Sequence, residues 1–364
     1  MGKRKVHYFN TYLAEVKDQL IKFDLPSLTK EGYYYDHSNY YILGTYPPLK
    51  AMESVEADSV YRSVSKNIHL YVHIPFCRQR CTFCHFYKLI NSSQSMVQSY
   101  IECLKLELKL VAHYMPDSLV TSIYIGGGTP SFLSPNQIEE VFDAVQKYFR
   151  LSDKAEITFE VHPAIVSETD AADRLNAAKN GGTNRWVIGL QSTDDEVLTR
   201  LNRGHSGAEF WSSLDLIRSV DPRDNVSIDL MYGLPLQSLE GLYETLIEVI
   251  DRGAIEKLNV FPLMFKGSDP ITRQYRSNPN DFPNEETRLL MSLLVDQVLG
   301  DRDFVQKPLF YYSSSGRHSA QQEAKFDSSS CEDLIAIGVS GFGYSSNTQY
   351  FNTCLLYTSP SPRD

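Results

Sequence analysis

The chain has 364 residues, of which 42% are hydrophobic, so it is long enough to bury a large core. Its formal net charge of −10 argues against a nucleic-acid-binding surface, which needs a concentrated excess of Lys and Arg. There is no run of about eighteen continuous apolar residues, and the amino terminus lacks the apolar centre of a signal peptide. We therefore expect a cytoplasmic protein without a membrane span.

Residues 1–66 are predicted to form an amino-terminal extension. Helical periodicity runs from Thr11 to Phe23, and a Tyr-rich, Pro-containing segment follows from Gly32 to Lys50. Tyrosines of this kind more often pack a loop against a neighbouring domain than stack on a flat ligand, because aromatic side chains bury large areas.

The segment from Ile68 to Lys88 places three cysteines directly after an apolar run. The β-branched and aromatic residues up to Phe76 are typical of a buried strand, so Cys77, Cys81 and Cys84 are expected on a loop at its carboxyl end. Soft thiolates select iron–sulfur clusters or zinc. With three thiolates, one iron of a four-iron cluster stays open for another ligand.

The spacing of the cysteines leaves two other interpretations open. A zinc site would combine the three thiolates with His85 or His73, although structural zinc loops more often carry two C-x2-C pairs. Disulfides are less expected, because they are rare in cytosolic proteins and three clustered thiols leave one unpaired.

A strand followed by an amphipathic helix recurs after the cysteine loop at intervals of roughly 30 to 40 residues. Alternation of this kind predicts a parallel sheet with right-handed crossovers, and six units are too few for a closed eight-stranded barrel. We therefore predict an α/β fold with an open, partial (β/α)6 barrel. The expected strands span residues 70–74, 122–125, 156–161, 185–190, 227–231 and 258–263, and the expected helices span residues 97–113, 135–148, 168–179, 208–218, 239–252 and 285–299.

Unusual residues follow successive predicted strands, at the sheet edge where parallel α/β folds collect their chemistry. The glycines of Gly126 to Pro130 allow positive φ and close backbone approach to a ligand. Later strands end in Glu160, Gln191 and Asp229. We expect these groups to converge on one polar ligand.

Five motifs in this order resemble the radical S-adenosylmethionine (radical SAM) superfamily over residues 67–352. They are HIPF with the C-x3-C-x2-C loop, GGGTP, EVHP, NRWVIGLQS followed by RLNRGH, and SIDLMYGLP. Within that superfamily the chain is similar to the oxygen-independent coproporphyrinogen III oxidase family, including its heme-chaperone and methyltransferase relatives. The resemblance implies a radical SAM core at residues 67–300 and, at residues 301–353, the start of a carboxyl-terminal segment that returns to the active site.

The resemblance also implies roles for individual residues. Cys77, Cys81 and Cys84 would hold a 4Fe–4S cluster whose open iron binds S-adenosylmethionine, and Tyr71 would contact that molecule. Its methionine and ribose portions would be held by Gly127, Gly128, Thr129 and Glu160. A second S-adenosylmethionine site would be lined by Phe83, Gln191, Arg203 and Asp229. From the returning segment, Phe342 would contact the cofactor. One or two molecules of S-adenosylmethionine would bind.

The implied chemistry is reductive cleavage of S-adenosylmethionine to a 5′-deoxyadenosyl radical, which abstracts a hydrogen atom from a substrate. The substrate would be a small molecule such as a tetrapyrrole, and the electron would come from a donor such as flavodoxin or ferredoxin. Zinc offers no redox step, so the motif combination favours the cluster.

Two departures from the family bear on the reaction. Phe86 stands where the oxidase has a fourth cysteine, and residues 317–322 do not reproduce the His-Asn-x-x-Tyr-Trp motif of the heme chaperones. Methyltransferase and heme-degrading relatives also lack the fourth cysteine. The oxidase-like reaction, radical methyl transfer or heme degradation, and a non-enzymatic heme chaperone therefore remain as alternatives. His205 is interpreted as a structural hydrogen-bonding residue in preference to a catalytic one.

Residues 354–364, CLLYTSPSPRD, break from every preceding pattern and read like a translated sequencing adapter. We exclude them from the fold and expect a truncated carboxyl-terminal domain.

Overall fold

The computed structural model describes residues 2–22, 52–266, 269–307, 309–316, 319–320, 332–345 and 348–353, of which residues 2–7 are described by their backbone alone. The Tyr-rich segment at 32–50 and the adapter-like residues 354–364 lie outside these ranges, so both interpretations stay predictions.

Six parallel strands form the centre of the sheet in chain order, each hydrogen-bonded to the next. Their apolar residues alternate between two covered faces, which explains why the strands were recognisable as apolar runs. Each observed strand overlaps a predicted one and most are longer. They are β1 (Asn67–Ile74), β4 (Leu119–Gly127), β5 (Arg150–Val161), β6 (Arg185–Gln191), β7 (Val226–Tyr232) and β8 (Lys257–Pro262).

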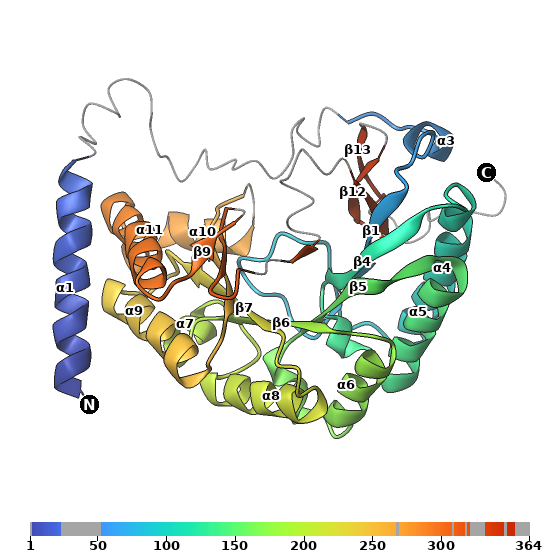
Figure 1. The fold of residues 1–364 in the computed structure, drawn as a ribbon. Helices are drawn as coiled ribbons and strands as arrows, with labels where there is room; N and C mark the ends of the chain where they lie inside the picture. The colour runs from blue at the N-terminus through green and yellow to red at the C-terminus, as the bar shows by residue number, and fades with distance from the viewer. Residues whose placement is uncertain are drawn as a thin grey trace.

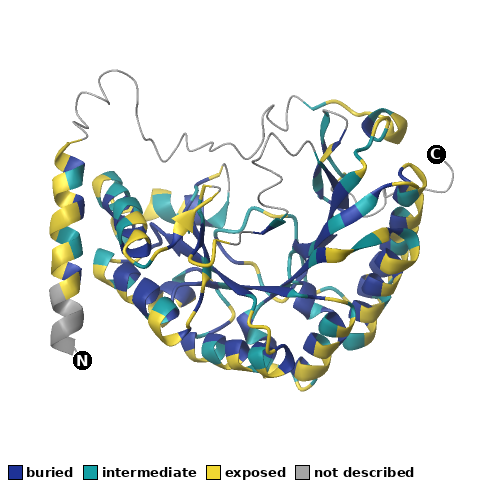
Figure 2. Ribbon diagram, viewed as in Figure 1, coloured by how far each residue is buried: buried dark blue, intermediate teal, exposed yellow. Residues whose placement is uncertain are grey.

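Helices between these strands cover the outer, convex face of the curved sheet (Figure 1). On α4, Val97, Ile101 and Leu104 recur at helical spacing and are almost completely buried against the sheet. Figure 2 shows the same division along the whole layer, with buried residues facing the sheet and exposed ones outside. The helices are α4 (Gln94–His113), α5 (Pro135–Tyr148), α6 (Ala171–Asn180), α8 (Gly207–Val220), α9 (Leu239–Ile247), which continues as a π-helical turn at Glu248–Arg252, and α11 (Glu285–Gly300).

Short strands that sequence periodicity did not indicate extend both edges of the sheet. Beyond β1 lie β11 (Asp333–Ile337), parallel to it, and then the antiparallel β12 (Phe342–Ser345) and β13 (Thr348–Phe351). Beyond β8 lies β10 (Tyr311–Ser313), antiparallel to β8, and then β9 (Val305–Gln306), antiparallel to β10. In the described chain β13 and β9 are the two end strands, so the expected open barrel is confirmed. Segments on either side of residue 300 share this one sheet.

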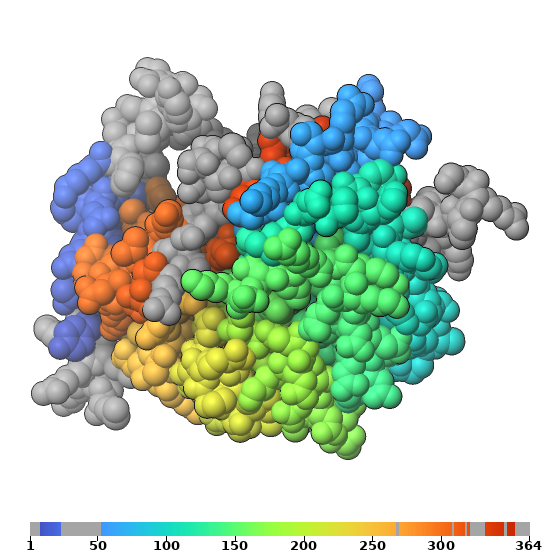
Figure 3. Space-filling view, turned by 45° about the vertical axis from the view of Figure 1, so that its right-hand side comes forward, coloured from blue at the N-terminus to red at the C-terminus, as the bar shows by residue number. Residues whose placement is uncertain are grey.

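The amino-terminal helix α1 (Gly2–Ile21) begins earlier than predicted and packs beside α11, as Figure 3 also shows. Phe9 and Tyr12 place their rings 5.5 and 5.7 Å from that of Tyr243 on α9. Gln19 donates a hydrogen bond to Gln297 on α11. Among the described helices, none is long and apolar enough to cross a membrane.

Smaller elements join these layers. They are the helices α3 (Ala57–Val60), α7 (Asp195–Arg200) and α10 (Pro270–Ser277), the paired strands β2 (Phe76–Cys77) and β3 (Leu89–Ile90), and the 3-10 turns η2 (Pro130–Phe132), η3 (Pro163–Ser167) and η5 (Pro279–Asp281).

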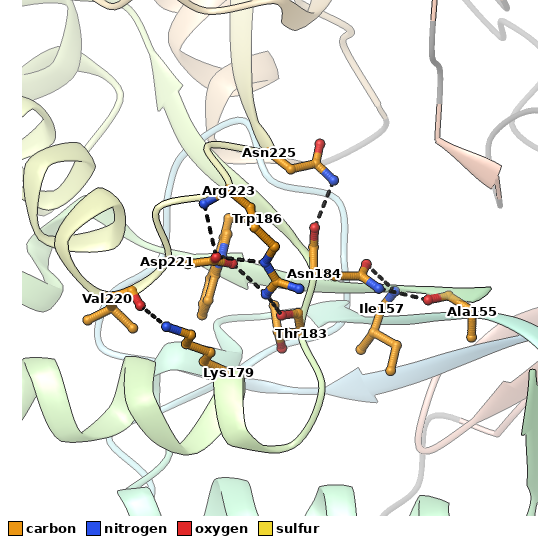
Figure 4. A network of polar contacts seen from close by, with 10 residues as sticks. All are labelled: Ala155, Ile157, Lys179, Thr183, Asn184, Trp186, Val220, Asp221, Arg223 and Asn225. Carbon is orange, nitrogen blue, oxygen red and sulfur yellow. Dashed lines mark hydrogen bonds and ion pairs between the residues drawn. The ribbon is translucent and has the colours of Figure 1, made fainter. Parts of the chain in front are cut away.

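A polar network closes the amino-terminal end of the strands (Figure 4). Asp221 is 1% exposed and accepts hydrogen bonds from the Trp186 indole and from the Arg223 guanidinium. Arg223 also donates to the backbone carbonyl of Thr183, and Asn184 bridges β5 and the β6 entrance through Ala155 and Ile157. The Asp221 carboxylate at this end therefore has its charge matched by Arg223.

Candidate functional site

A cavity of about 390 Å³ lies at the carboxyl-terminal ends of the central strands. Most of the predicted site residues line it, although they come from segments far apart in the sequence. The lining includes Cys77, Cys81, Phe83, Cys84, Gly128, Thr129, Glu160, Gln191, Arg203 and Asp229.

Three predicted residues take other positions. Tyr71 is in β1, and Gly127 ends β4; neither lines the cavity, although both adjoin residues that do. Phe342 begins β12, two strands beyond β1, and is also absent from the described lining of the cavity. The contact of Phe342 with a cofactor thus stays a prediction of the resemblance alone.

The cysteine loop is held in place by backbone hydrogen bonds on both sides. Pro75 ends β1, and the loop begins with the short pairing of β2 with β3. In the middle of the loop, the Thr82 N–H donates to Leu201 O at 2.9 Å, and Thr82 O accepts from the Ile271 N–H at 3.1 Å. The end of α7, which follows β6, and the start of α10, which follows β8, therefore both hold the middle of the cysteine loop.

Two polar side chains reach the thiols. Thr129 lies with its hydroxyl 3.4 Å from the sulfur of Cys77, and Arg203 donates from a guanidinium nitrogen 3.3 Å from the sulfur of Cys81. Burial raises the pKa of the Cys77 thiol to about 11, and the Thr129 hydrogen bond opposes this shift. Donors and a positive charge beside buried sulfurs favour thiolates, the form that binds metal.

Glu160 is oriented by two donors that come from β4. The Tyr124 hydroxyl donates to Oε1 at 2.6 Å, and the backbone N–H of Gly127 donates to Oε2 at 3.2 Å. Burial and the Glu160 charge both raise the pKa of Tyr124 well above its ordinary value, so the phenol stays a donor. The carboxylate keeps a defined direction toward the cavity.

The glycine run owes its residue type to contacts within the chain. Gly127 has φ +112°, and a β-carbon there would lie 2.5 Å from the His73 ring. At Gly128 a β-carbon would lie 2.8 Å from the carbonyl oxygen of Ile74. The sequence indicated close approach of a ligand, whereas the structure shows close approach of β4 to the end of β1.

Gln191 of β6 and Asp229 of β7 also line the cavity. The Asn259 amide of β8 donates to Asp229 Oδ1 at 2.6 Å. Gln191 has φ +78° and follows a register shift between β6 and β7, an unusual conformation for a residue with a side chain. Arg203, which contacts Cys81, also donates to the carbonyl of Gly189. These contacts join the thiol loop to the ends of β6 and β7.

The mouth of the cavity combines charged and aromatic side chains. Arg78 and Arg174 form ion pairs with Glu168. Phe86, at the position of the oxidase's fourth cysteine, is 63% exposed and lines the opening, so no fourth thiol is present there. His85, which follows Cys84, forms an ion pair with Asp269, the residue before α10.

The donor set fits an iron–sulfur cluster better than a single ion. Within the described ranges, no group of three or more His, Cys, Asp or Glu side chains surrounds one metal position. A single zinc ion at about 2.3 Å from each sulfur needs such a group, whereas a four-iron cluster binds each thiolate through a different iron. The three thiols instead share one cavity wall, with donors beside two of them.

Comparison with known proteins places this site in a class. Residues 71–249 match the radical SAM superfamily model, and the fold is similar to that of coproporphyrinogen III oxidase (HemN) from Escherichia coli, with a TM-score of 0.69, 24% identity, and coverage of 80% of this chain and 68% of that chain. Residues 71–249 thus form a radical SAM domain, and this class of domain implies a 4Fe–4S cluster and S-adenosylmethionine.

Within the superfamily the chain is similar to proteins with different names. It is 29% identical to oxygen-independent coproporphyrinogen III oxidase from Salmonella typhimurium, over 91% of this chain and 74% of that protein. It is 30% identical, over 80% of this chain, to the mitochondrial radical S-adenosyl methionine domain-containing protein 1 from Danio rerio. It is 27% identical, over 78% of this chain, to the heme chaperone HemW from Bacillus subtilis. The chain spans 63% of the Danio rerio protein and 72% of the Bacillus subtilis protein.

Sequence reasoning missed several residues that build the site. Tyr124 donates a hydrogen bond to Glu160, and Asn259 donates one to Asp229. Both donors lie inside apolar strands: Tyr124 two residues before Gly126, and Asn259 within KLNVFP. His73 was considered only as a zinc ligand, yet its ring packs on Gly127 and contacts the Tyr71 hydroxyl at 3.0 Å. A polar residue at an inward position of an otherwise apolar strand was the available signal.

Proposed function

We propose that the chain is a radical SAM enzyme with an oxidase-like reaction on a tetrapyrrole or a related small molecule. The observation that carries this proposal is the shared cavity of Cys77, Cys81, Cys84, Glu160 and Asp229. Three thiols on one wall suit a cluster with an open iron, and two oriented carboxylates suit the amino, sulfonium and hydroxyl groups of S-adenosylmethionine.

A 4Fe–4S cluster bound by these cysteines would supply one-electron reduction of S-adenosylmethionine, the chemistry that hydrogen-atom abstraction from a substrate requires. The protein residues bind and orient. Cys77, Cys81 and Cys84 would hold the cluster, with Thr129 and Arg203 stabilising the charge on the sulfurs. Glu160 and Tyr124 would orient the first S-adenosylmethionine, and Gln191 and Asp229 would hold a second one.

The test is anaerobic reconstitution of a full-length version with iron and sulfide, reduction in the presence of S-adenosylmethionine, and analysis of the small-molecule products. Accumulation of 5′-deoxyadenosine in the wild type but not in Cys81→Ala supports the proposal. S-adenosylhomocysteine formed alongside it would indicate methyl transfer. Zinc uptake without a cluster chromophore and without cleavage would contradict the proposal.

A heme chaperone is the second candidate, because Phe86 replaces the fourth cysteine and lies 63% exposed at the cavity mouth. An exposed aromatic ring beside a cavity suits contact with a flat macrocycle. Stable heme on the purified protein, with no consumption of S-adenosylmethionine, would favour this function over the oxidase-like one.

A further inference from the structure

Arg185 is a charged residue buried below the cavity. It begins β6 and is 1% exposed, and it lies in register with Thr158 on β5. The next residue, Trp186, bonds Asp221 in the network outside the sheet, so strand alternation directs Arg185 to the inside of the barrel. Arg185 thus lies under the same strands whose carboxyl-terminal ends carry Glu160 and Asp229.

The hydrogen bonds of Arg185 go to neutral groups. One guanidinium nitrogen donates to the Thr158 hydroxyl at 3.2 Å and the other to the Ser227 hydroxyl at 2.9 Å, while Nε has no partner in the described chain. None of the ion pairs found among the described residues includes Arg185. Burying a cation that bonds no carboxylate costs free energy. A negative group near Arg185 would offset this cost.

The negative groups near Arg185 belong to the cavity. Burial raises the pKa of Asp229 to about 6, and the hydrogen bond from Asn259 and the charges of Arg185 and Arg203 act against that shift. The charge of Arg185 also opposes the rise that burial causes in the pKa of Tyr124, the donor to Glu160. Asp229 is therefore faced by Arg185 from β6, by Arg203 on the side of the thiols, by Asn259 from β8 and by Tyr124 from β4.

We propose that Arg185 is a positioning residue: it bonds Ser227, two residues before Asp229 on the same face of β7, and from there its charge holds the Asp229 carboxylate for a positively charged group of S-adenosylmethionine. This inference rests on the proposed function, because it takes S-adenosylmethionine as the ligand of the cavity. Arg203 donates hydrogen bonds to Cys81 and Gly189, whereas Arg185 donates only to neutral hydroxyls. The charge of Arg185 is therefore available to interact with the Asp229 carboxylate.

The first experiment uses protein without a cluster. The free energy of unfolding is measured against pH for the wild type, Asp229→Asn, Arg185→Met and the double variant. The wild type is expected to lose stability relative to Asp229→Asn as the pH rises from about 4 through about 6, because the pKa of Asp229 is raised in the folded state. In the Arg185→Met background the same loss is expected to extend about one pH unit higher.

The second experiment measures binding of S-adenosylmethionine to the reconstituted protein between pH 6 and pH 9. Arg185→Met is expected to weaken binding about fivefold at pH 6 and about twofold at pH 7, and to regain the wild-type affinity at pH 9, where Asp229 ionises without help. Arg185→Lys keeps the charge and is expected to keep the wild-type pH profile. The double variant with Asp229→Asn is expected to show no pH-dependent recovery.

Equal weakening by Arg185→Met at every pH, with an unchanged stability profile of Asp229, would overturn the inference and leave Arg185 a structural residue. If Arg185→Met does not fold, Arg185→Gln removes the charge and keeps one hydroxyl contact, and the same outcomes apply. Failure of the proposed function is separate: the wild type itself would then form no cluster chromophore or bind no S-adenosylmethionine, while the cluster-free stability comparison would stand.

Discussion

The two ends of the central sheet carry buried polar groups of opposite character. At the amino-terminal end, Asp221 accepts from both Trp186 and Arg223, and its charge is matched where it lies. At the carboxyl-terminal end, Asp229 has an amide partner, and Cys77 lies buried beside a threonine hydroxyl. The first arrangement stabilises the fold, whereas the second holds groups that are completed only by a ligand.

The shifts in pKa express the same difference. Burial raises the pKa of Asp221, but hydrogen bonds from Arg223 and Trp186 outweigh it and leave the pKa below its ordinary value. Burial raises the pKa of Asp229 to about 6, and its partners do not outweigh it. Ionisation of Asp221 therefore stabilises the folded chain at neutral pH, whereas ionisation of Asp229 destabilises it.

The largest effect is expected for Cys81→Ala at the carboxyl-terminal end. Loss of one thiolate removes a cluster ligand, so we expect no cluster chromophore and no detectable 5′-deoxyadenosine after reconstitution. The free energy of unfolding of the cluster-free protein should change little, because the substitution removes only one sulfur. Cys103→Ala, on the exposed side of α4, is the matched control and should behave like the wild type. Equal activity of the two variants would contradict the site.

Asp221→Ala should have the reverse pattern. It leaves the Trp186 indole and the Arg223 guanidinium without their shared acceptor, and we expect a loss of about 2–3 kcal/mol in the free energy of unfolding. Because the pKa of Asp221 is lowered in the folded state, the difference from the wild type should be full at pH 7 and shrink as the pH falls below about 4. Denaturant titrations at several pH values measure it, and a constant difference would refute the assignment.

Tyr124→Phe tests orientation within the site. The change removes only the hydroxyl that donates to Glu160 at 2.6 Å. A hydrogen bond to a charged group contributes about 1.5–3 kcal/mol, so affinity for S-adenosylmethionine should fall roughly tenfold or more. Tyr148→Phe, at the end of α5, is the control. Unchanged binding in Tyr124→Phe would show that Glu160 does not need this donor.

The smallest effect is expected at Glu107 of α4, which joins the edge strands to the core. It accepts from the Gly338 N–H at 2.9 Å and from Asn352 at 3.2 Å, and burial raises its pKa to about 7. A raised pKa means that stability falls as the pH rises from about 4.5 through 7. Glu107→Gln should lack this dependence in thermal unfolding at pH 5 and pH 8. A parallel decline in both proteins would exclude Glu107 as its source.

Much of the fold could be read from local patterns. The six central strands and their helices were predicted close to their observed limits, because each repeats an apolar strand and a helix with one apolar face. The edge strands were missed because they are short and depend on partners: β11 pairs with β1, more than 250 residues earlier in the chain. Such pairing leaves little local signal.

The site shows the same limit at the level of side chains. Spacing alone brought out Cys77, Cys81 and Cys84, and strand ends brought out Glu160 and Asp229. The local sequence shows Arg185 and Tyr124 only as polar residues within apolar strands and does not show which groups they contact. Their roles depend on which strand lies beside them and on which face of the sheet they occupy.

The sequence by itself determined the class of protein, the open α/β barrel and the three thiols, because these rest on residue types at short spacing. Only the tertiary structure decided which charges share the cavity, which donors orient the carboxylates, and that the glycines make room for β1 and not for a ligand alone. The reason is physical: hydrogen bonds and burial depend on distances between strands, and those distances exist only after the sheet has formed.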